Sequence, residues 1–150
     1  MIADLDEYTI NGKVAKPAPG TCASYNLIYC FICTLCNKPY AGRTVTQLNT
    51  RTNKHRSAFY KVLDIHNAGN DINTYEFDDD DDAFSLGIHL VSDHSCLDKS
   101  DFNKVFRVFI LENCSPASLE VKEHKYIHKF KTLKPFGLNS ANPFSIPLLH

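Results

Sequence analysis

The chain has 150 residues, a formal net charge of −1 and 43% hydrophobic residues. That length fits one domain with one core, and that apolar content is ordinary for a globular protein. No apolar stretch approaches the roughly 20 residues of a membrane span, and the acidic, polar first residues do not resemble a secretory signal. Composition therefore predicts an intracellular domain with no membrane partner.

The six cysteines are a second constraint on function. Without a secretory signal, a reducing compartment is expected, where cysteines serve as thiols or metal ligands. Three of them, Cys30, Cys33 and Cys36, form a Cys-x-x-Cys-x-x-Cys cluster with the spacing of a metal site. An even number of cysteines would also suit a disulfide framework, but the spacing and the missing signal favour metal ligation.

The charge is distributed unevenly along the chain. Residues 38–61 contain six basic residues and no acidic one, and residues 122–134 contain five lysines and a single glutamate. Two basic segments in a nearly neutral chain favour a positive face that binds a polyanion such as nucleic acid. The alternative is that they are two solvated helix faces.

Composition also divides the chain into three parts. Residues 1–21 hold few apolar residues and end in a Pro- and Gly-rich stretch, so they are predicted to be a flexible N-terminal tail. Residues 22–140 are predicted to form the domain. Residues 141–150 are predicted to be an extended C-terminal tail that could wrap around the core.

The domain is predicted to begin with a β-hairpin. Residues 26–33 are a continuous apolar and β-branched run, typical of a buried strand. Asn37 and Pro39 favour a turn, and residues 40–44 form a short second strand. Gly42 permits an unusual backbone angle or the close approach of another group. The hairpin thus carries cysteines near its tip.

A helix, a loop, a strand and a last helix are predicted to follow. The first helix runs from an N-cap at Thr46 to about Leu63. Residues 66–82 are an acidic loop insertion, whose five aspartates lack the spaced ligands and glycine of an EF-hand calcium loop. Residues 104–114 alternate like a strand, and residues 118–133 carry a helical apolar stripe. The order β-β-α-loop-β-α predicts an α+β fold with a small, mostly antiparallel three-stranded sheet flanked by helices.

Five polar residues in these elements make a set that a protein core would not select. A phenol or imidazole can take a proton from water, an arginine can stabilise a pentavalent phosphate, and a carboxylate can hold a divalent cation. The set therefore indicates phosphodiester hydrolysis, and its members are Tyr29, Tyr40, Arg51, His55 and Glu123. The alternatives are core packing for the tyrosines, an exposed helix face for Arg51 and His55, and a surface ion pair for Glu123.

Taken in order, these residues resemble the GIY-YIG nucleases. The triplet LIY at 27–29 lies where GIY would be, and YAG at 40–42 lies where YIG would be. The resemblance covers about residues 26–139 and continues through Arg51, His55, Glu123 and Asn139. Leu27 and Ala41 depart from the family pattern, but both are backbone or packing positions, so no reactive group is lost.

The closer resemblance is to the endonuclease domain of Penelope-like retroelements, which contains a zinc site. It implies a structural zinc clip that ties the hairpin tip to the segment after the acidic loop. Two cysteines and two histidines are a sound tetrahedral ligand set, and here they are Cys33, Cys36, His89 and His94. Cys30 is interpreted as a buried thiol, while His55, His66 and Cys96 remain alternative ligands.

The resemblance implies a metal-dependent DNA endonuclease, or nickase, that leaves 5′-phosphate and 3′-hydroxyl ends. One Mg²⁺ or Mn²⁺ would be held by Glu123, and Arg51 would stabilise the phosphate. Tyr29 or Tyr40, alone or with His55, would activate water. DNA contacts are expected from Lys38, Arg43, Lys54, Arg56 and Asn139.

In a retroelement, the nick would supply the primer for reverse transcription. The resemblance therefore implies a reverse transcriptase partner, absent from these 150 residues, and a nuclear location. Two alternatives from other classes are a catalytically inactive, zinc-stabilised nucleic-acid-binding module and a metal-stabilised protein-interaction domain. Neither the target sequence nor the oligomeric state follows from the residue pattern.

Overall fold

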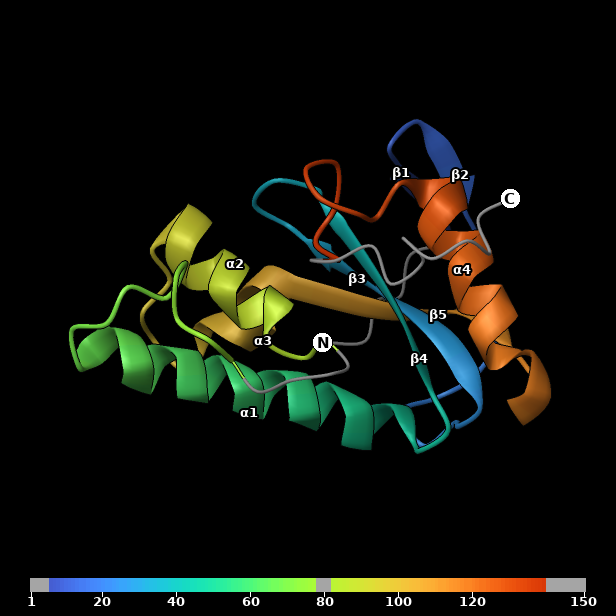
Figure 1. Ribbon diagram of the computed structural model, residues 1–150. Helices are drawn as coiled ribbons and strands as arrows, with labels where there is room; N and C mark the ends of the chain where they lie inside the picture. Colours follow the sequence, from blue (N-terminus) through green and yellow to red (C-terminus); the bar gives the residue numbers. More distant parts are fainter. Residues whose placement is uncertain (1–5, 78–81, 140–150) are drawn as a thin grey trace.

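The computed structural model describes residues 6–77 and 82–139 of the chain. They form an α+β fold in which a three-stranded antiparallel sheet has helices on both faces (Figure 1). The predicted C-terminal tail and the aspartates at 78–81 lie outside the described residues.

The sheet is built around one fully buried strand. β3 (Leu27–Cys33) lies between β4 (Pro39–Thr44) and β5 (Phe106–Asn113), and both pairings are antiparallel. Because β3 is the central strand and is covered on both faces, its sequence is apolar throughout instead of alternating. The predicted hairpin and the predicted later strand are confirmed, although β5 begins at Phe106, two residues later than expected.

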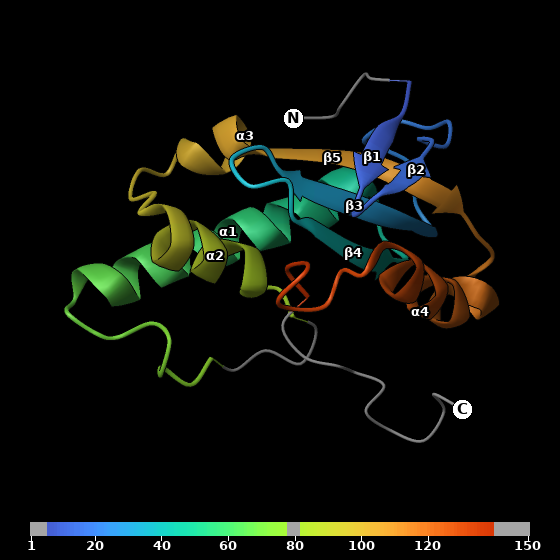
Figure 2. The same cartoon turned by 90° about the horizontal axis from the view of Figure 1, so that it is seen from above.

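One face of the sheet is covered by two helices packed together, α1 (Leu48–Asn67) and α2 (Ser85–His94) (Figure 1, Figure 2). A Cβ on Gly87 of α2 would lie 2.8 Å from Phe59 Cα of α1, so glycine lets the two helices approach closely. α1 was predicted, and it extends four residues beyond the expected end. α2 and the short α3 (Asp101–Val105) were not predicted.

The other face is covered by α4 (Leu119–Phe130), which follows a single 3₁₀ turn, η1 (Pro116–Ser118). None of the helices in the described parts of the chain is long and apolar enough to cross a bilayer.

A β-hairpin completes the cover on this second face, where the sequence predicted a flexible tail. β1 (Tyr8–Ile10) pairs with β2 (Lys13–Ala15), and the Tyr8 ring stacks on Phe109 of the sheet with centroids 4.4 Å apart. Ile10 is buried in the same cluster. The tail prediction is therefore wrong for these residues. Asn11–Gly12, both at positive φ, is the dipeptide typical of a two-residue hairpin turn, and it was the overlooked signal.

The outer edge of β4 is covered by the segment that follows α4. The Pro39 carbonyl accepts a hydrogen bond from Leu138 N at 2.8 Å. Two residues along, Asn139 Oδ1 accepts from Ala41 N and its Nδ2 donates to Ala41 O, both at 3.0 Å. The Asn139 amide thus substitutes for a neighbouring strand and satisfies an open sheet edge.

This geometry corrects the prediction that Asn139 contacts DNA. The side chain is buried, and both polar atoms of its amide are bonded to Ala41. Its role in this structure is to hold the C-terminal segment on β4.

Replacing Asn139 with alanine is expected to lower the free energy of unfolding by about 2–3 kcal/mol, because it leaves the N–H and C=O of Ala41 without partners in a buried site. Urea denaturation of the variant beside wild type measures this. Asn113→Ala is the matched control, since Asn113 donates one hydrogen bond at an exposed site. Unchanged stability together with weaker DNA binding would restore the DNA-contact interpretation.

Candidate active site and metal site

The Tyr29 phenol lies against the backbone of Gly42, its partner across the β3–β4 pair. A Cβ at position 42 would collide with the phenol oxygen and Cζ of Tyr29. Glycine is therefore required for the ring to occupy this place. Because β4 is the edge strand, the phenol oxygen is brought close to the outer edge of the sheet.

Two side chains one turn apart on α1 converge on this phenol. Tyr29 Oη lies 2.8 Å from His55 Nε2, and Arg51 Nε donates to the same oxygen at 3.1 Å. The guanidinium can only donate, so the Tyr29 oxygen accepts from it and its own proton can be directed at the imidazole. The structure thus brings together three of the five predicted catalytic residues.

His55 is fully buried among aromatic rings. The centroids of Tyr29, Phe31 and Tyr40 lie 5.8, 5.3 and 5.2 Å from its own. The packing of these rings therefore fixes the orientation of the imidazole.

Tyr40 lies beside Tyr29, with ring centroids 6.5 Å apart. Burial raises the pKa of Tyr40 well above its ordinary value, and the charges of Tyr29, Asp82 and Glu123 raise it further. Tyr40 is thus a protonated phenol at neutral pH. Asp82, which the sequence suggested only as part of the acidic loop, belongs to the charged surroundings of this phenol.

Glu123 approaches the same edge from the other face of the sheet. Its Oε1 lies 3.5 Å from Arg43 Nη1, and its side chain is only 17% exposed. Burial raises the pKa of Glu123 to about 7, while the charges of Arg43 and Arg51 and a backbone hydrogen bond from Arg43 lower it. A partly buried carboxyl beside two arginines can hold a cation or face a phosphate.

His124 is a further polar residue at this end of α4. Its Nε2 lies 3.9 Å from Glu120 Oε1, one turn earlier, and burial lowers its pKa. Proximity to Glu123 in the sequence was the only signal for it.

The other predicted DNA contacts are not gathered at one place. Lys54 is exposed on α1, whereas Lys38 lies in the hairpin turn, close enough for its charge to lower the pKa of His89. Arg56 lies about 140° around α1 from Arg51, and its Nε and Nη2 donate to Asn103 Oδ1 of α3 at 3.1 and 3.0 Å. The structure therefore separates Arg56 from the Tyr29–Glu123 region.

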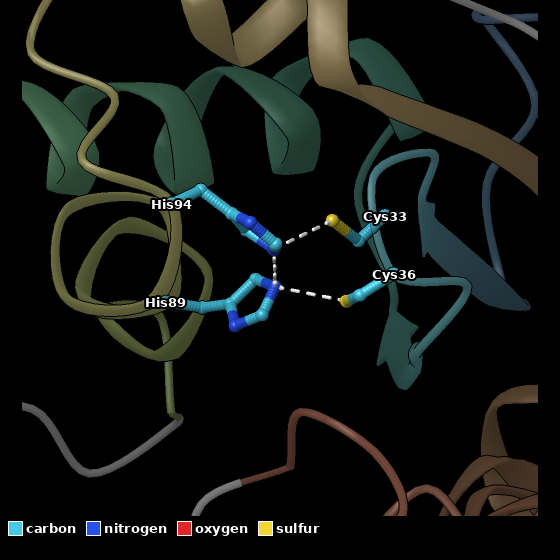
Figure 3. A group of neighbouring side chains, drawn as sticks. All are labelled: Cys33, Cys36, His89 and His94. Carbon is cyan, nitrogen blue, oxygen red and sulfur yellow. Dashed lines mark hydrogen bonds between the residues drawn. The ribbon is translucent and has the colours of Figure 1, made fainter.

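Two cysteines from the hairpin and two histidines from α2 form the second site (Figure 3). Cys33 Sγ lies 3.5 Å from His94 Nε2, Cys36 Sγ lies 3.4 Å from His89 Nε2, and the two Nε2 atoms are 3.2 Å apart. All four ligand atoms lie within 4.8 Å of one another, so the cluster could hold a metal ion.

These distances match the edges of a tetrahedral zinc site. Zn–S bonds of about 2.3 Å and Zn–N bonds of about 2.0–2.1 Å place S and N ligands about 3.5 Å apart, and two N ligands about 3.3 Å apart. The observed separations are 3.4, 3.5 and 3.2 Å. These three separations therefore fit a zinc ion.

The surroundings of the cluster also suit a metal. His89 Nδ1 lies 2.6 Å from Asp93 Oδ2, and such a carboxylate fixes the tautomer that leaves Nε2 free for the ion. Burial raises the pKa of the Cys33 thiol to about 11 and lowers the pKa of His89. A metal would displace the thiol protons on binding.

The rival ligands lie elsewhere. Cys30 is buried in the cluster on the other face of the sheet, and His55 is bonded to Tyr29. Cys96 contacts the His94 carbonyl through its own sulfur at 3.8 Å. In the described residues, the group that could hold a metal is thus the predicted Cys33, Cys36, His89 and His94.

Comparison of this chain with protein-family models, with curated proteins and with solved structures finds no match.

We expect Cys36→Ser to abolish stoichiometric metal binding, because it removes one of four ligands. Co²⁺ substitution measures this, with the absorption bands of tetrahedral thiolate coordination expected in wild type and lost in the variant. Cys22→Ser is the control, since Cys22 is an exposed thiol outside the group that could hold a metal. Equal metal content in Cys36→Ser and wild type would contradict the assignment.

The raised pKa of Glu123 makes stability depend on pH. Between its ordinary value of 4.5 and about 7, the folded chain binds a proton that the unfolded chain has lost, so wild type loses stability as pH rises. Glu123→Gln cannot titrate. The free energy of unfolding of the variant minus that of wild type is therefore expected to rise by about 2 kcal/mol between pH 5.5 and 8. Chemical denaturation without added Mg²⁺ measures this difference, and a flat difference would show an ordinary Glu123 pKa.

Proposed function

We propose that this chain is a metal-dependent DNA endonuclease domain of the GIY-YIG type that nicks one strand. The observation that supports the proposal best is the convergence of Tyr29, Arg51 and His55 with Glu123 at the β4 edge. The groups come from β3, α1 and α4, on both sides of the sheet. Together they include a base, a cation and a carboxylate, which are the groups that phosphodiester hydrolysis requires.

Tyr29 is the proposed general base. Its oxygen accepts a hydrogen bond from Arg51, which stabilises negative charge on the phenolate, and His55 Nε2 lies at 2.8 Å to receive the phenolic proton. Tyr40 is the weaker candidate, because the contacts with Arg51 and His55 that would activate a phenol are made by Tyr29. Tyr40 instead helps to enclose the imidazole and keep water away from it.

Arg51 is proposed to stabilise the phosphate as well as the phenolate. Its Nε is committed to Tyr29, and its charge also lowers the pKa of Glu123. The guanidinium therefore lies between the base and the carboxylate, where charge would develop on a bound phosphate. Arg43, on the other side of Glu123, is the proposed contact to the DNA strand.

Glu123 is the proposed ligand of a single Mg²⁺ or Mn²⁺ ion. A partly buried carboxyl with a pKa of about 7 fits a cation, because a bound cation would compensate the ionised form. When bound, such an ion supplies Lewis-acid stabilisation of the phosphate and its leaving oxygen.

The zinc ion is proposed to be structural. Its ligands join the hairpin to α2, and no predicted catalytic residue belongs to the set. A closed tetrahedral set of four protein ligands leaves no open position for a substrate. The Cys-Cys-His-His set is what suggests a Penelope-like origin, with DNA as substrate and a reverse transcriptase as functional partner in the nucleus.

Nicking of supercoiled plasmid tests the proposal. Wild type loaded with zinc and given Mg²⁺ or Mn²⁺ is expected to produce open circles. Arg51→Ala, Tyr29→Phe and Glu123→Gln are each expected to be slower by about 10²–10³-fold, the typical effect of losing one charge-stabilising group.

The matched control is Arg56→Ala, which removes an arginine of the same helix that faces α3. It is expected to nick at nearly the wild-type rate. Circular dichroism and zinc content confirm that each variant is folded. If wild type binds DNA in a salt-sensitive way but never nicks it, an inactive nucleic-acid-binding module is the better account.

A further inference from the structure

Two segments without acidic residues meet on the outside of α4. Residues 8–22 contain two lysines and no acidic residue, and residues 124–139 contain four lysines and no acidic residue. They are more than a hundred positions apart in a chain whose net charge is −1. Their meeting in space therefore concentrates positive charge that the overall composition conceals.

One side chain holds the segments together. Asn11 Nδ2, at the turn of the β1–β2 hairpin, lies within hydrogen-bonding distance of three carbonyls, at 2.7 Å from Phe130 O, 3.2 Å from Lys131 O and 3.3 Å from Phe136 O. Both views show this hairpin beside α4 (Figure 1, Figure 2). Lys13, two residues after Asn11, is thus fixed near the lysines that end and follow the helix.

The lysines of this region are exposed. We call them the lysine surface, and they are Lys13, Lys125, Lys129, Lys131 and Lys134. The ammonium groups of Lys125 and Lys129 lie 5.2 Å from the ring centroids of Tyr126 and Phe130, so their stems follow the helix surface. Among the ion pairs of the described residues, none involves the lysine surface, whereas the neighbouring Lys122 is paired with Glu112.

Helix stability accounts for only part of this arrangement. Lysines in the last turn favour the negative end of a helix, but Lys125 lies further back and Lys13 belongs to another element. Like charges gathered in one region repel one another, and an anionic partner would relieve that repulsion.

Two members of the lysine surface, Lys125 and Lys129, face away from the candidate active site. Ile127 faces the core, and Lys125 and Lys129 lie about 160° around the helix from it. They are about 120–160° around the helix from Glu123. A phosphate held at Glu123 is therefore on a different side of α4 from Lys125 and Lys129.

We propose that the lysine surface is a second polyanion site that binds the sugar-phosphate backbone of a double-stranded DNA segment other than the one at Glu123. The choice of DNA as the polyanion rests on the proposed function. Exposed lysines that contact phosphates carry no sequence information, so the site binds duplex DNA of any sequence and releases counterions in doing so.

The test compares two double variants that remove the same charge. Lys13→Gln with Lys129→Gln takes one lysine from each segment of the lysine surface. Lys99→Gln with Lys104→Gln is the matched control, because both lysines are exposed and lie outside the two segments that form the lysine surface. Lys99 also lies over the ring of Tyr60, as Lys129 lies over that of Phe130. Binding to a fluorescent 20-base-pair duplex is measured by anisotropy from low to high salt, with zinc-loaded protein and no added Mg²⁺.

The lysine-surface pair is expected to reduce the slope of log K against log salt by about 2, since each lost phosphate contact removes about 0.9. Affinity at about 0.1 M salt is expected to fall by one to two orders of magnitude, and the control is expected to match wild type. Equal losses in both pairs would show an effect of net charge alone and overturn the proposal. The proposal would also be overturned if the lysine-surface double variant bound duplex DNA as wild type does but no longer bound a poly-glutamate peptide. That result would indicate an acidic protein partner.

Failure of this proposal is distinguishable from failure of the proposed function. Wild type that binds duplex through the lysine surface without nicking plasmid would overturn only the nuclease assignment. If wild type nicks plasmid and the lysine-surface double variant binds duplex DNA as wild type does, only the proposal of a second site is overturned.

Discussion

The contact between the Tyr29 phenol and the backbone of Gly42 is the constraint on which the candidate active site depends. The antiparallel register places these residues opposite each other, and the missing side chain at 42 gives the ring its room. The phenol oxygen then lies where Arg51 and His55 reach it from α1. β4 is the edge strand, so α4 can bring Glu123 to the same edge from the opposite face. A larger residue at 42 would displace the phenol from its partners.

The rest of the fold supports this edge from two directions. The Asn139 amide covers the β4 edge at Ala41, and the Leu138 N–H covers it at Pro39. Two residues further along the same edge, the backbone of Arg43 is hydrogen-bonded to Glu123. At the other end of the hairpin, the cluster of two cysteines and two histidines links the turn to α2, which packs on α1. A metal there would join elements separated by more than fifty residues, which stabilises a small sheet that lacks long strands.

The sequence predicted the elements whose patterns are local. The apolar run of β3, the alternation of β5 and the helical stripe of α4 are set by which faces are buried. α2 was missed because a helix buried on most sides, in the sequence SLGIHLVSDH, has no polar face to give it a period. β1 and β2 were missed because each has only three residues, although Asn11–Gly12 marked their turn.

Site residues were predictable where one element decides the geometry. Arg51 and His55 are four residues apart, so they share a face of α1 wherever that helix packs. Cys33 and Cys36 lie at the same hairpin turn. Arg56 and Asn139 were not predictable, because their roles depend on distant partners, Asn103 on α3 and Ala41 on the β4 edge. Spacing along the chain does not reveal which partner a polar side chain meets across the fold.

The cost of burying an ionisable group supports the proposal of an enzyme over that of a module that only binds. Phosphate binding needs exposed cations, and the proposed polyanion site would supply these without burying any charge. By contrast, Glu123 is mostly buried with its pKa raised to about 7, and the burial of this carboxyl costs stability. A carboxylate beside a phosphate would also repel it unless a cation lay between them. A buried carboxyl thus lowers stability and, without a cation, opposes phosphate binding. A residue that does both is expected where it is positioned for chemistry.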